Sequence, residues 1–189
     1  MSQYQESSIR VLKGLEPVKQ RPGMYTRTDC PLHIIQEVID NATDEALSGN
    51  GKRIVVTQYT DSSIEVSDEG RGIPIGMHPE EQIPVVELAF TKLHAGGKFN
   101  KMEKGSSYRF TGGLHGVGVS VTNALSMRLQ VTVSRDGGVH QMEFSSGDVS
   151  VPLRKIGKTE KENTGTTVRA WPDSKYFDSA VIPIKELKD

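Results

Sequence analysis

The sequence predicts an α+β domain, a two-layer sandwich in which helices cover one face of a mostly antiparallel sheet. Short β-rich segments come in pairs joined by turn residues, a pattern typical of hairpins and therefore of antiparallel strands. One strongly amphipathic helix stands out among them, and no internal repeat or low-complexity tract interrupts the chain. Because 189 residues can bury one substantial core, we expect residues 1–189 to form a single domain.

The helix that stands out is expected from Leu32 to Leu47. Its apolar residues recur at i, i+3, i+4, i+7 and i+11, which places them on one buried face, and Gly49 follows its end. Before it we expect a short helix over Ile9–Leu15, because Pro17 follows, and then a loop over 22–31. The remaining expected elements are strands over 53–59 and 63–67, a helix over 80–93, a glycine-rich segment over 95–113, a helix over 116–125, strands around 129–133 and 142–144, a strand over 166–171 and the start of a helix over 184–189.

Composition excludes several classes of protein. Hydrophobic residues make up 35% and charged residues 25% of the chain, as in globular domains rather than disordered or membrane proteins. The net charge of −1 gives no general electrostatic attraction to DNA. A single cysteine, Cys30, rules out an internal disulfide and a cysteine-based metal cluster. No apolar run has the length of a membrane span and no signal peptide is recognisable, so we expect a cytoplasmic protein without a membrane partner.

Oxygen-bearing side chains line one stripe of the expected helix 32–47. Glu37, Asn41, Asp44 and Glu45 lie at i, i+4, i+7 and i+8, and His33 lies one turn earlier. The helix holds four acidic residues and no Lys or Arg. A solvated helix face is one interpretation, although such faces usually mix charges of both signs. The alternative is a site for a hard cation such as Mg²⁺, which favours oxygen ligands and accompanies phosphate groups.

A turn with two glycines follows the expected strand 63–67. Its residues are Asp68-Glu69-Gly70-Arg71-Gly72. Glycines allow a backbone to approach a ligand closely, and an aspartate at this point can accept a hydrogen bond from an exocyclic amine such as that of adenine. An ordinary turn at the end of a strand is the alternative interpretation.

A second glycine-rich turn opens the expected helix 116–125. Its residues are Gly112-Gly113-Leu114-His115-Gly116-Val117-Gly118. Backbone N–H groups at such a helix start favour an anion, although a plain glycine turn has the same appearance. The spacing is not that of a dinucleotide-binding fingerprint, and the Gly97-Lys98 pair lacks the Ser or Thr of a P-loop. Taken in order, the carboxylate–amide helix, the aspartate turn and this glycine turn predict one nucleotide site.

These motifs resemble those of the ATPase family that includes DNA gyrase, Hsp90-type chaperones, histidine kinases and the mismatch-repair protein MutL, the GHKL family. The shared motifs are Glu37-Val38-Ile39-Asp40-Asn41, Asp68-Glu69-Gly70-Arg71-Gly72, Gly113-Leu114-His115-Gly116-Val117-Gly118 and Thr164-Gly165-Thr166. Longer stretches narrow the resemblance to the ATPase subunits of the bacterial type IIA topoisomerases, gyrase and topoisomerase IV; they include Leu15-Glu16-Pro17-Val18, Arg21-Pro22-Gly23-Met24-Tyr25 and Leu93-His94-Ala95-Gly96-Gly97-Lys98-Phe99. Three other stretches resemble topoisomerase IV more than gyrase: His78-Pro79-Glu80-Glu81, Pro84-Val85-Val86-Glu87-Leu88 and Gln36-Glu37-Val38-Ile39-Asp40-Asn41. The resemblance implies the GHKL, or Bergerat, form of the two-layer sandwich.

The resemblance also implies roles for individual residues. Glu37 corresponds to the general base that activates the water attacking the γ-phosphate, with His33 orienting it, and Asn41 to a ligand of Mg²⁺. Asp68 corresponds to the acceptor for the adenine amine, with Thr166 supporting it. The other implied ATP-binding residues are Arg71, Gly72, Pro74 and Arg135 at the pocket rim, Lys98 and Tyr108 in the lid, and Gly113, Leu114, His115, Gly116, Val117 and Gly118 around the triphosphate.

Two departures from the family pattern accompany these roles. The stretch Phe99–Arg109 is a few residues longer than is usual, and Glu69 stands where a second aspartate is common. In the family a following transducer domain supplies a phosphate-sensing lysine. We therefore expect this chain, as an N-terminal piece of a longer subunit, to bind ATP and to hydrolyse it weakly by itself.

The resemblance implies partners as well. These are DNA held by other domains, the DNA-cleaving subunit of the same enzyme, a second copy of the ATPase subunit that joins on ATP binding through the arm around Tyr4, and aminocoumarin-type or other inhibitors of the adenine pocket. Two other functions stay open on the same scaffold. A histidine-kinase catalytic domain would have no use for a water-activating Glu37, and a nucleotide-gated module such as a chaperone or mismatch-repair clamp would differ in its surrounding domains.

Overall fold

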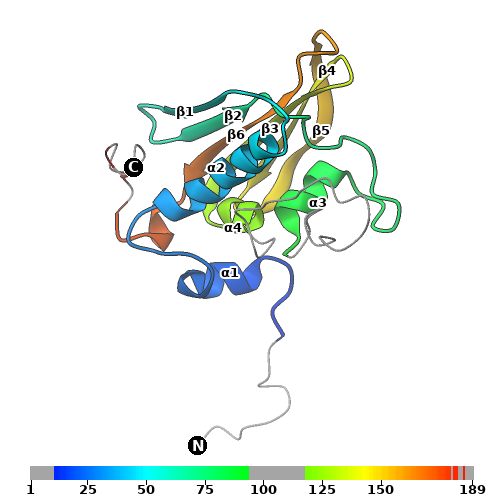
Figure 1. Ribbon diagram of the computed structural model, residues 1–189. Coiled ribbons are helices and arrows are strands. Elements are labelled where there is room, and N and C mark those ends of the chain that lie inside the picture. The colour runs from blue at the N-terminus through cyan, green and yellow to red at the C-terminus, as the bar shows by residue number, and fades with distance from the viewer. Residues whose placement is uncertain (1–10, 94–117, 180, 183–184, 186–189) are drawn as a thin grey trace, which may run out of the picture.

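The computed structural model describes residues 11–93, 118–179, 181–182 and 185, and it confirms the two-layer sandwich. Six antiparallel strands form one sheet in the order β1 (Ile54–Gln58), β2 (Ile64–Asp68), β6 (Gly165–Pro172), β3 (Ser126–Arg135), β4 (Gly138–Ser145) and β5 (Asp148–Lys158). The helices are α1 (Glu16–Gln20), α2 (Leu32–Leu47), α3 (Val85–Thr91) and α4 (Gly118–Ala124), with short 3₁₀ turns at Pro22–Met24 and Ser174–Tyr176. Figure 1 shows α2, α3 and α4 on one face of the sheet.

The core lies between this face and the helices. Successive strand residues point to opposite faces, so Leu129, Val131 and Val133 of β3 are all fully buried on the helix side. From α2, the side chains of Ile34 and Ile35 are buried against them in the same cluster. The expected helix 32–47 is confirmed with both of its bounds, because its apolar face and its closing glycines agree on where it ends.

The short helix expected over Ile9–Leu15 is wrong where the structure describes it. Residues 11–13 are not helical, and α1 begins at Glu16, with Pro17 inside its first turn. Proline is well tolerated there because the first N–H groups of a helix have no partner within the helix. Proline therefore marks the beginning of this helix and not the end of an earlier one.

Two further differences also involve proline. The helix expected over 80–93 is shorter, because Pro84 is extended and α3 begins only after it. Strand β5 was not expected at all. It contains Pro152 and many exposed charged residues, which make its sequence look like a loop. At the edge of a sheet one side of a strand needs no ladder hydrogen bonds, so proline is accepted. The helix start expected over 184–189 lies outside the described residues, apart from position 185.

Polar side chains on the opposite face of the sheet bind one another. Asp61 accepts hydrogen bonds from the backbone N–H (3.0 Å) and the hydroxyl (2.5 Å) of Ser63 through Oδ1, and from Trp171 Nε1 (3.0 Å) through Oδ2. Arg169 forms an ion pair with the same carboxylate, at 3.0 Å. The Ser63 hydroxyl, followed by the Ser63 N–H, lowers the pKa of Asp61 to about 2. Among the residues that the structure describes, the labelled helices α2, α3 and α4 lie on the other face of the sheet (Figure 1).

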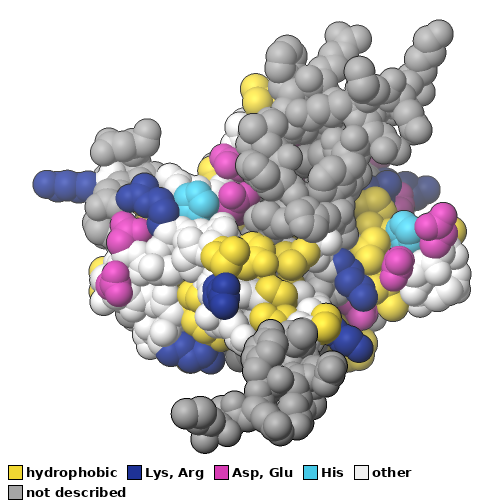
Figure 2. Space-filling view, turned by 90° about the horizontal axis from the view of Figure 1, so that it is seen from below, with side chains coloured by type: hydrophobic (Ala, Val, Ile, Leu, Met, Phe, Trp, Pro, Cys, Tyr) yellow, Lys and Arg dark blue, Asp and Glu magenta, His cyan; other side chains and the backbone are white. Residues whose placement is uncertain are grey.

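The side of the molecule that carries α1 has a mixed surface. Figure 2 shows hydrophobic side chains gathered near the middle of this side, with charged side chains of both signs toward its edges. Such interspersed charges produce no large field of a single sign, in line with the net charge of −1. Among the residues that the structure describes, no helix is long and apolar enough to cross a bilayer.

Candidate functional site

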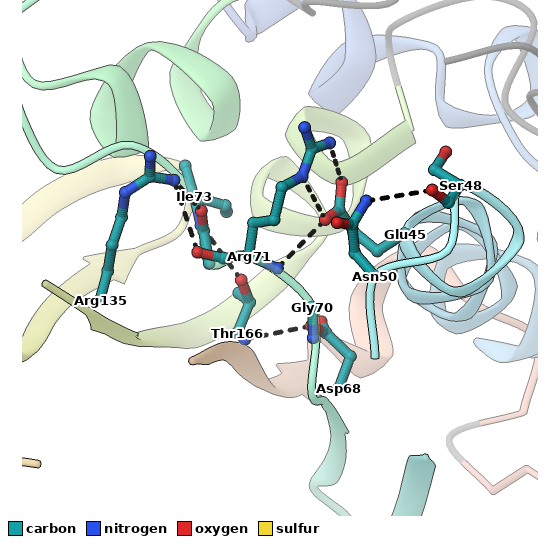
Figure 3. Close-up of polar contacts among 10 residues, drawn as sticks. Glu45, Ser48, Asn50, Asp68, Gly70, Arg71, Ile73, Arg135 and Thr166 are labelled. Carbon is teal, nitrogen blue, oxygen red and sulfur yellow. Dashed lines mark hydrogen bonds and ion pairs between the residues drawn. The ribbon is translucent and has the colours of Figure 1, made fainter. Parts of the chain in front are cut away.

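Asp68 and the predicted rim residues come together around the turn that follows β2. This turn, residues 68–72, lies between the C-terminal half of α2 and the adjoining ends of β6 and β3 (Figure 3). Asp68 is the last residue of β2, Thr166 is near the start of β6, and Arg135 ends β3. Sheet pairing therefore brings Arg135 and Thr166 to the turn 68–72, although they lie about seventy and about one hundred positions after Asp68 in the sequence.

Asp68 is a half-buried carboxylate with a fixed orientation. Its Oδ1 accepts hydrogen bonds from the backbone N–H of Gly70 (2.7 Å) and from that of Thr166 (3.3 Å). Burial raises the pKa of Asp68, and the negative charge of Glu45 raises it further, whereas the two N–H groups act in the opposite direction. Both of these bonds are accepted by Oδ1.

Both glycines of the turn are required by close packing within the protein. A Cβ on Gly72, whose φ is +72°, would lie 2.8 Å from the backbone oxygen of Ser134 and 3.1 Å from Val133 Cγ1. A Cβ on Gly70 would lie 2.7 Å from Asp68 Oδ1 and 3.0 Å from Glu45 Cβ. The sequence suggested that these glycines make room for a ligand. The structure shows in addition that they let the turn fit between α2 and the sheet.

Arg71 ties the turn to α2. Its Nε and Nη2 atoms donate to Glu45 Oε2 and Oε1 at 3.1 and 2.8 Å, and its backbone N–H donates to Oε2 at 3.2 Å. The forked geometry gives this pair direction as well as charge. A cation therefore reaches the acidic stripe from another element, and the expectation of a stripe without cations is wrong at Glu45. The described partner of Glu45 is Arg71, so Glu45 is no longer a candidate metal ligand.

The rim of the site is held by backbone contacts. Arg135 Nη1 donates to the carbonyl oxygen of Gly72 at 2.7 Å. The hydroxyl of Thr166 accepts from the backbone N–H of Ile73 at 3.3 Å, and this side chain is buried. Pro74, which follows, is exposed. The predicted rim residues therefore adjoin one another, and Arg135 and Thr166 bind the two ends of the same peptide group, between Gly72 and Ile73.

The second half of the site lies on α2. The amide nitrogen of Asn41 donates to the backbone oxygen of Glu37 at 3.0 Å, which directs the amide oxygen away from that carbonyl. Asp44 lies on the predicted polar stripe, yet it is only 1% exposed. The stripe is therefore not simply a solvated helix face. The ring of His33 contacts the hydroxyl of Thr26, with Nδ1 at 2.8 Å from Oγ1, a partner that no sequence pattern indicated.

Of the predicted glycine cradle, only Gly118 is described. It is the first residue of α4 and lies directly against Glu37: a Cβ on Gly118 would be 2.7 Å from Glu37 Cδ. The other predicted residues of the cradle and the lid lie outside the described residues; they are Lys98, Tyr108, Gly113, Leu114, His115, Gly116 and Val117. In the described part of the chain, no group of three or more His, Cys, Asp or Glu side chains lies close enough together to hold a metal ion.

Comparisons with known proteins agree on one family. The model of the histidine kinase-, DNA gyrase B- and HSP90-like ATPases matches residues 28–175. The chain is 53% identical over 188 residues to the B subunit of DNA topoisomerase 4 from Pseudomonas aeruginosa, covering 100% of this chain and 29% of the relative. It is 50% identical over 178 residues to the B subunit of DNA gyrase from Campylobacter jejuni, covering 93% of this chain and 22% of the relative.

A solved structure shows the same fold. The topoisomerase IV ATP-binding domain of Francisella tularensis, in complex with a small-molecule inhibitor, superposes with a TM-score of 0.81 at 48% identity, over 94% of this chain and 46% of that one. The chain thus spans less than a third of the length of the curated relatives that it matches.

Proposed function

Because the chain belongs to the family of histidine kinase-, DNA gyrase B- and HSP90-like ATPases, we propose that it binds ATP between α2 and the turn 68–72 and hydrolyses it there. One observation carries the proposal. Asp68 is oriented by two backbone N–H groups through one oxygen, which leaves its other oxygen placed to accept the adenine amine. The hydroxyl of Thr166, buried beside it, supports the same base.

The chemistry is in-line transfer of the γ-phosphoryl group to water. Glu37 accepts the proton of the attacking water, and His33, one turn earlier on α2, helps to orient that carboxylate. Arg71, Gly72, Pro74 and Arg135 form the rim around the adenine. The remaining proposed contacts, from Lys98, Tyr108 and residues 113–118, surround the sugar and the triphosphate.

Asn41 is the residue of this chain that would hold Mg²⁺. Its amide nitrogen is bound to the α2 backbone, so the amide oxygen would be the ligand atom, and oxygen is the ligand that Mg²⁺ prefers. A bound Mg²⁺ supplies charge stabilisation to phosphate oxygens and keeps several water ligands, so one amide oxygen beside the phosphates is a sufficient protein contribution.

We further propose that this domain serves a bacterial type IIA topoisomerase of the topoisomerase IV kind, in the cytoplasm. The relatives named above include ATPase subunits of such enzymes. ATP binding would close a clamp made by two copies of the ATPase subunit, while DNA and the DNA-cleaving subunit would be held by other domains. Small molecules such as aminocoumarins would compete in the adenine pocket, in line with the inhibitor complex of the Francisella tularensis domain. Gyrase is the second candidate, because gyrase relatives reach 50% identity.

Two experiments test the proposal. Calorimetric titration of the 189-residue chain with a non-hydrolysable ATP analogue and Mg²⁺ should show one site, and absence of binding would contradict it. In a protein of the relatives' full length, Glu37→Ala should abolish hydrolysis while nucleotide binding persists, because a base is lost and no binding contact is removed. Undiminished hydrolysis would reject Glu37 as the base. Decatenation without supercoiling by the same protein, joined to its DNA-cleaving subunit, would separate topoisomerase IV from gyrase.

A further inference from the structure

Helix α4 packs closely against α2 where Glu37 lies. Gly118, the first residue of α4, has no side chain, and a Cβ at that position would overlap Glu37 Oε2 and would lie 2.7 Å from Cδ and 2.9 Å from Cβ. Real Cβ atoms essentially never come within 3.0 Å of a heavy atom in this way. The carboxylate of Glu37 therefore occupies space that any other residue at position 118 would fill.

One turn further along, α4 binds the backbone of α2. The hydroxyl of Thr122 donates to the carbonyl oxygen of Ile34 at 2.7 Å, and both residues are fully buried. Thr122 follows Gly118 by four positions, so the two share one face of α4. Ile34 precedes Glu37 by three positions, so these two share one face of α2. The hydrogen bond and the close contact therefore act on the same turn of α2.

A second side of α4 is anchored independently. The amide nitrogen of Asn123 donates to the carbonyl oxygens of Phe90 at the end of α3 (2.9 Å) and of Gly147 in the β4–β5 turn (3.0 Å). Asn123 is fully buried. Helix α4 is thus fixed to α3 and to the sheet, and it can serve as a rigid support for α2.

We propose that Gly118 and Thr122 are positioning residues for the carboxylate of Glu37. Gly118 sets how close α4 comes to the carboxylate and limits the rotamers that it can adopt. Thr122 holds the turn of α2 from which Glu37 projects. The inference rests on the proposed function, since it assigns the consequence of this contact to the general base. It goes beyond a role of Gly118 in contacting phosphate, because the contact described here is with a protein side chain.

The physical reason is the precision that a general base requires. A base must lie within hydrogen-bond reach of the water that it deprotonates, and a misplacement of about 1 Å can cost about a hundredfold in rate. Glu37 has three rotatable side-chain bonds, so a wall on one side and a fixed helix backbone reduce its freedom. Both constraints come from α4.

The first experiment tests the contact itself, independently of any activity. Thermal unfolding of the 189-residue chain should show a lower midpoint for Gly118→Ala, by about 3 °C or more, because an added methyl group strains a packed site. In a Glu37→Ala background the same change should cost less than half as much, since the Oε2 and Cδ contacts are gone. Gly23→Ala is the matched control: a Cβ there meets nothing within 4 Å, so its effect should be small in both backgrounds.

The second experiment measures hydrolysis and binding in a protein of the relatives' full length. Gly118→Ala should lower kcat about tenfold or more, and by a clearly larger factor than it weakens the affinity for a non-hydrolysable ATP analogue, since Gly118 is also a proposed triphosphate contact. Thr122→Val should lower kcat by a smaller factor, and Thr122→Ser, which keeps the hydroxyl, should restore most of it. Gly23→Ala should leave both quantities unchanged.

These experiments distinguish a failure of the positioning role from a failure of the proposed function. Equal destabilisation by Gly118→Ala in both backgrounds would overturn the contact, whatever the activity. A loss of affinity as large as the loss of kcat would overturn the positioning role and leave Gly118 only its proposed contact with the triphosphate. If Glu37→Ala itself hydrolyses ATP normally, the base assignment fails, while the stability coupling still reports on the contact.

Discussion

Replacing Asp68 by asparagine is the sharpest test of the adenine contact. In the structure Oδ1 accepts from the backbone N–H groups of Gly70 and Thr166, at 2.7 and 3.3 Å. An asparagine that keeps these two bonds must place its amide oxygen where Oδ1 was. Its NH₂ group then takes the place of Oδ2, so that in the proposed complex two donors would meet: the asparagine amide and the adenine amine.

The magnitude follows from the kind of bond that is lost. A hydrogen bond to a charged group contributes about 1.5–3 kcal/mol, and the variant replaces it by an unfavourable contact. Since every 1.4 kcal/mol is about tenfold in affinity, the dissociation constant for ATP should rise about 10- to 150-fold. The fold should survive, because burial disfavours the charge of Asp68 and the neutral amide does not carry that cost.

The assay is calorimetric titration with a non-hydrolysable ATP analogue and Mg²⁺, accompanied by thermal unfolding of each variant. Asp148→Asn is the matched control, because the Asp148 side chain is 91% exposed and its ion pair with Lys19 is long, at 3.9 Å. If the amide instead turns its oxygen toward the ligand, the Gly70 and Thr166 bonds are lost and the unfolding temperature falls. Unchanged affinity together with unchanged stability would refute the assignment.

Three further predictions concern the same sheet and turn. The free energy of unfolding should fall between about pH 4 and pH 2. The lowered pKa of Asp61 contributes stability that is fully present above the ordinary pKa of an aspartate and is lost as pH drops through about 2. In urea unfolding, Asp61→Asn should lack this pH-dependent part of the stability. Gly72→Ala should lower the free energy of unfolding by about 1–3 kcal/mol, and each kcal/mol lowers the unfolding temperature by about 2–4 °C. Gly76→Ala should leave the unfolding temperature unchanged, because a Cβ there meets nothing within 4 Å. Glu45→Gln should lower the pKa of Asp68 only part of the way toward its ordinary value, since burial is the larger cause, and an NMR titration that finds no change would contradict that coupling.

Sequence patterns located the elements whose local signals agree with one another. Helix α2 was predicted with both bounds because its apolar periodicity and its closing glycines mark the same ends. Strands β3 and β4 were recognised because apolar alternation stops at the Asp136-Gly137 turn. The errors at α1, α3 and β5 share one cause. A proline can begin a helix, delay it or lie in an edge strand, and tertiary context decides which of these occurs.

The site was less accessible to local reasoning. That an aspartate, a glycine turn and an acidic helix form one nucleotide site came from their order and from the family resemblance. The pairing of Arg71 with Glu45 depends on how α2 lies over the turn, and their separation of 26 positions matches no local periodicity. The burial of Asp44 has the same origin, because helical spacing cannot show what covers a polar stripe. The roles of Glu37, His33 and Asn41 stay predictions for the experiments above.

The place of β6 has a consequence for synthesis on the ribosome. This strand is the last of the six to be made, yet it lies inside the sheet and joins β2 to β3. Asp68 emerges early, but the Thr166 N–H that orients it arrives about a hundred residues later. Until then β1 and β2 have no neighbour on one side, and hairpins of this kind are marginal in isolation. A nascent chain should therefore gain nucleotide affinity in a single late step, so that ATP cannot act on a partly made domain.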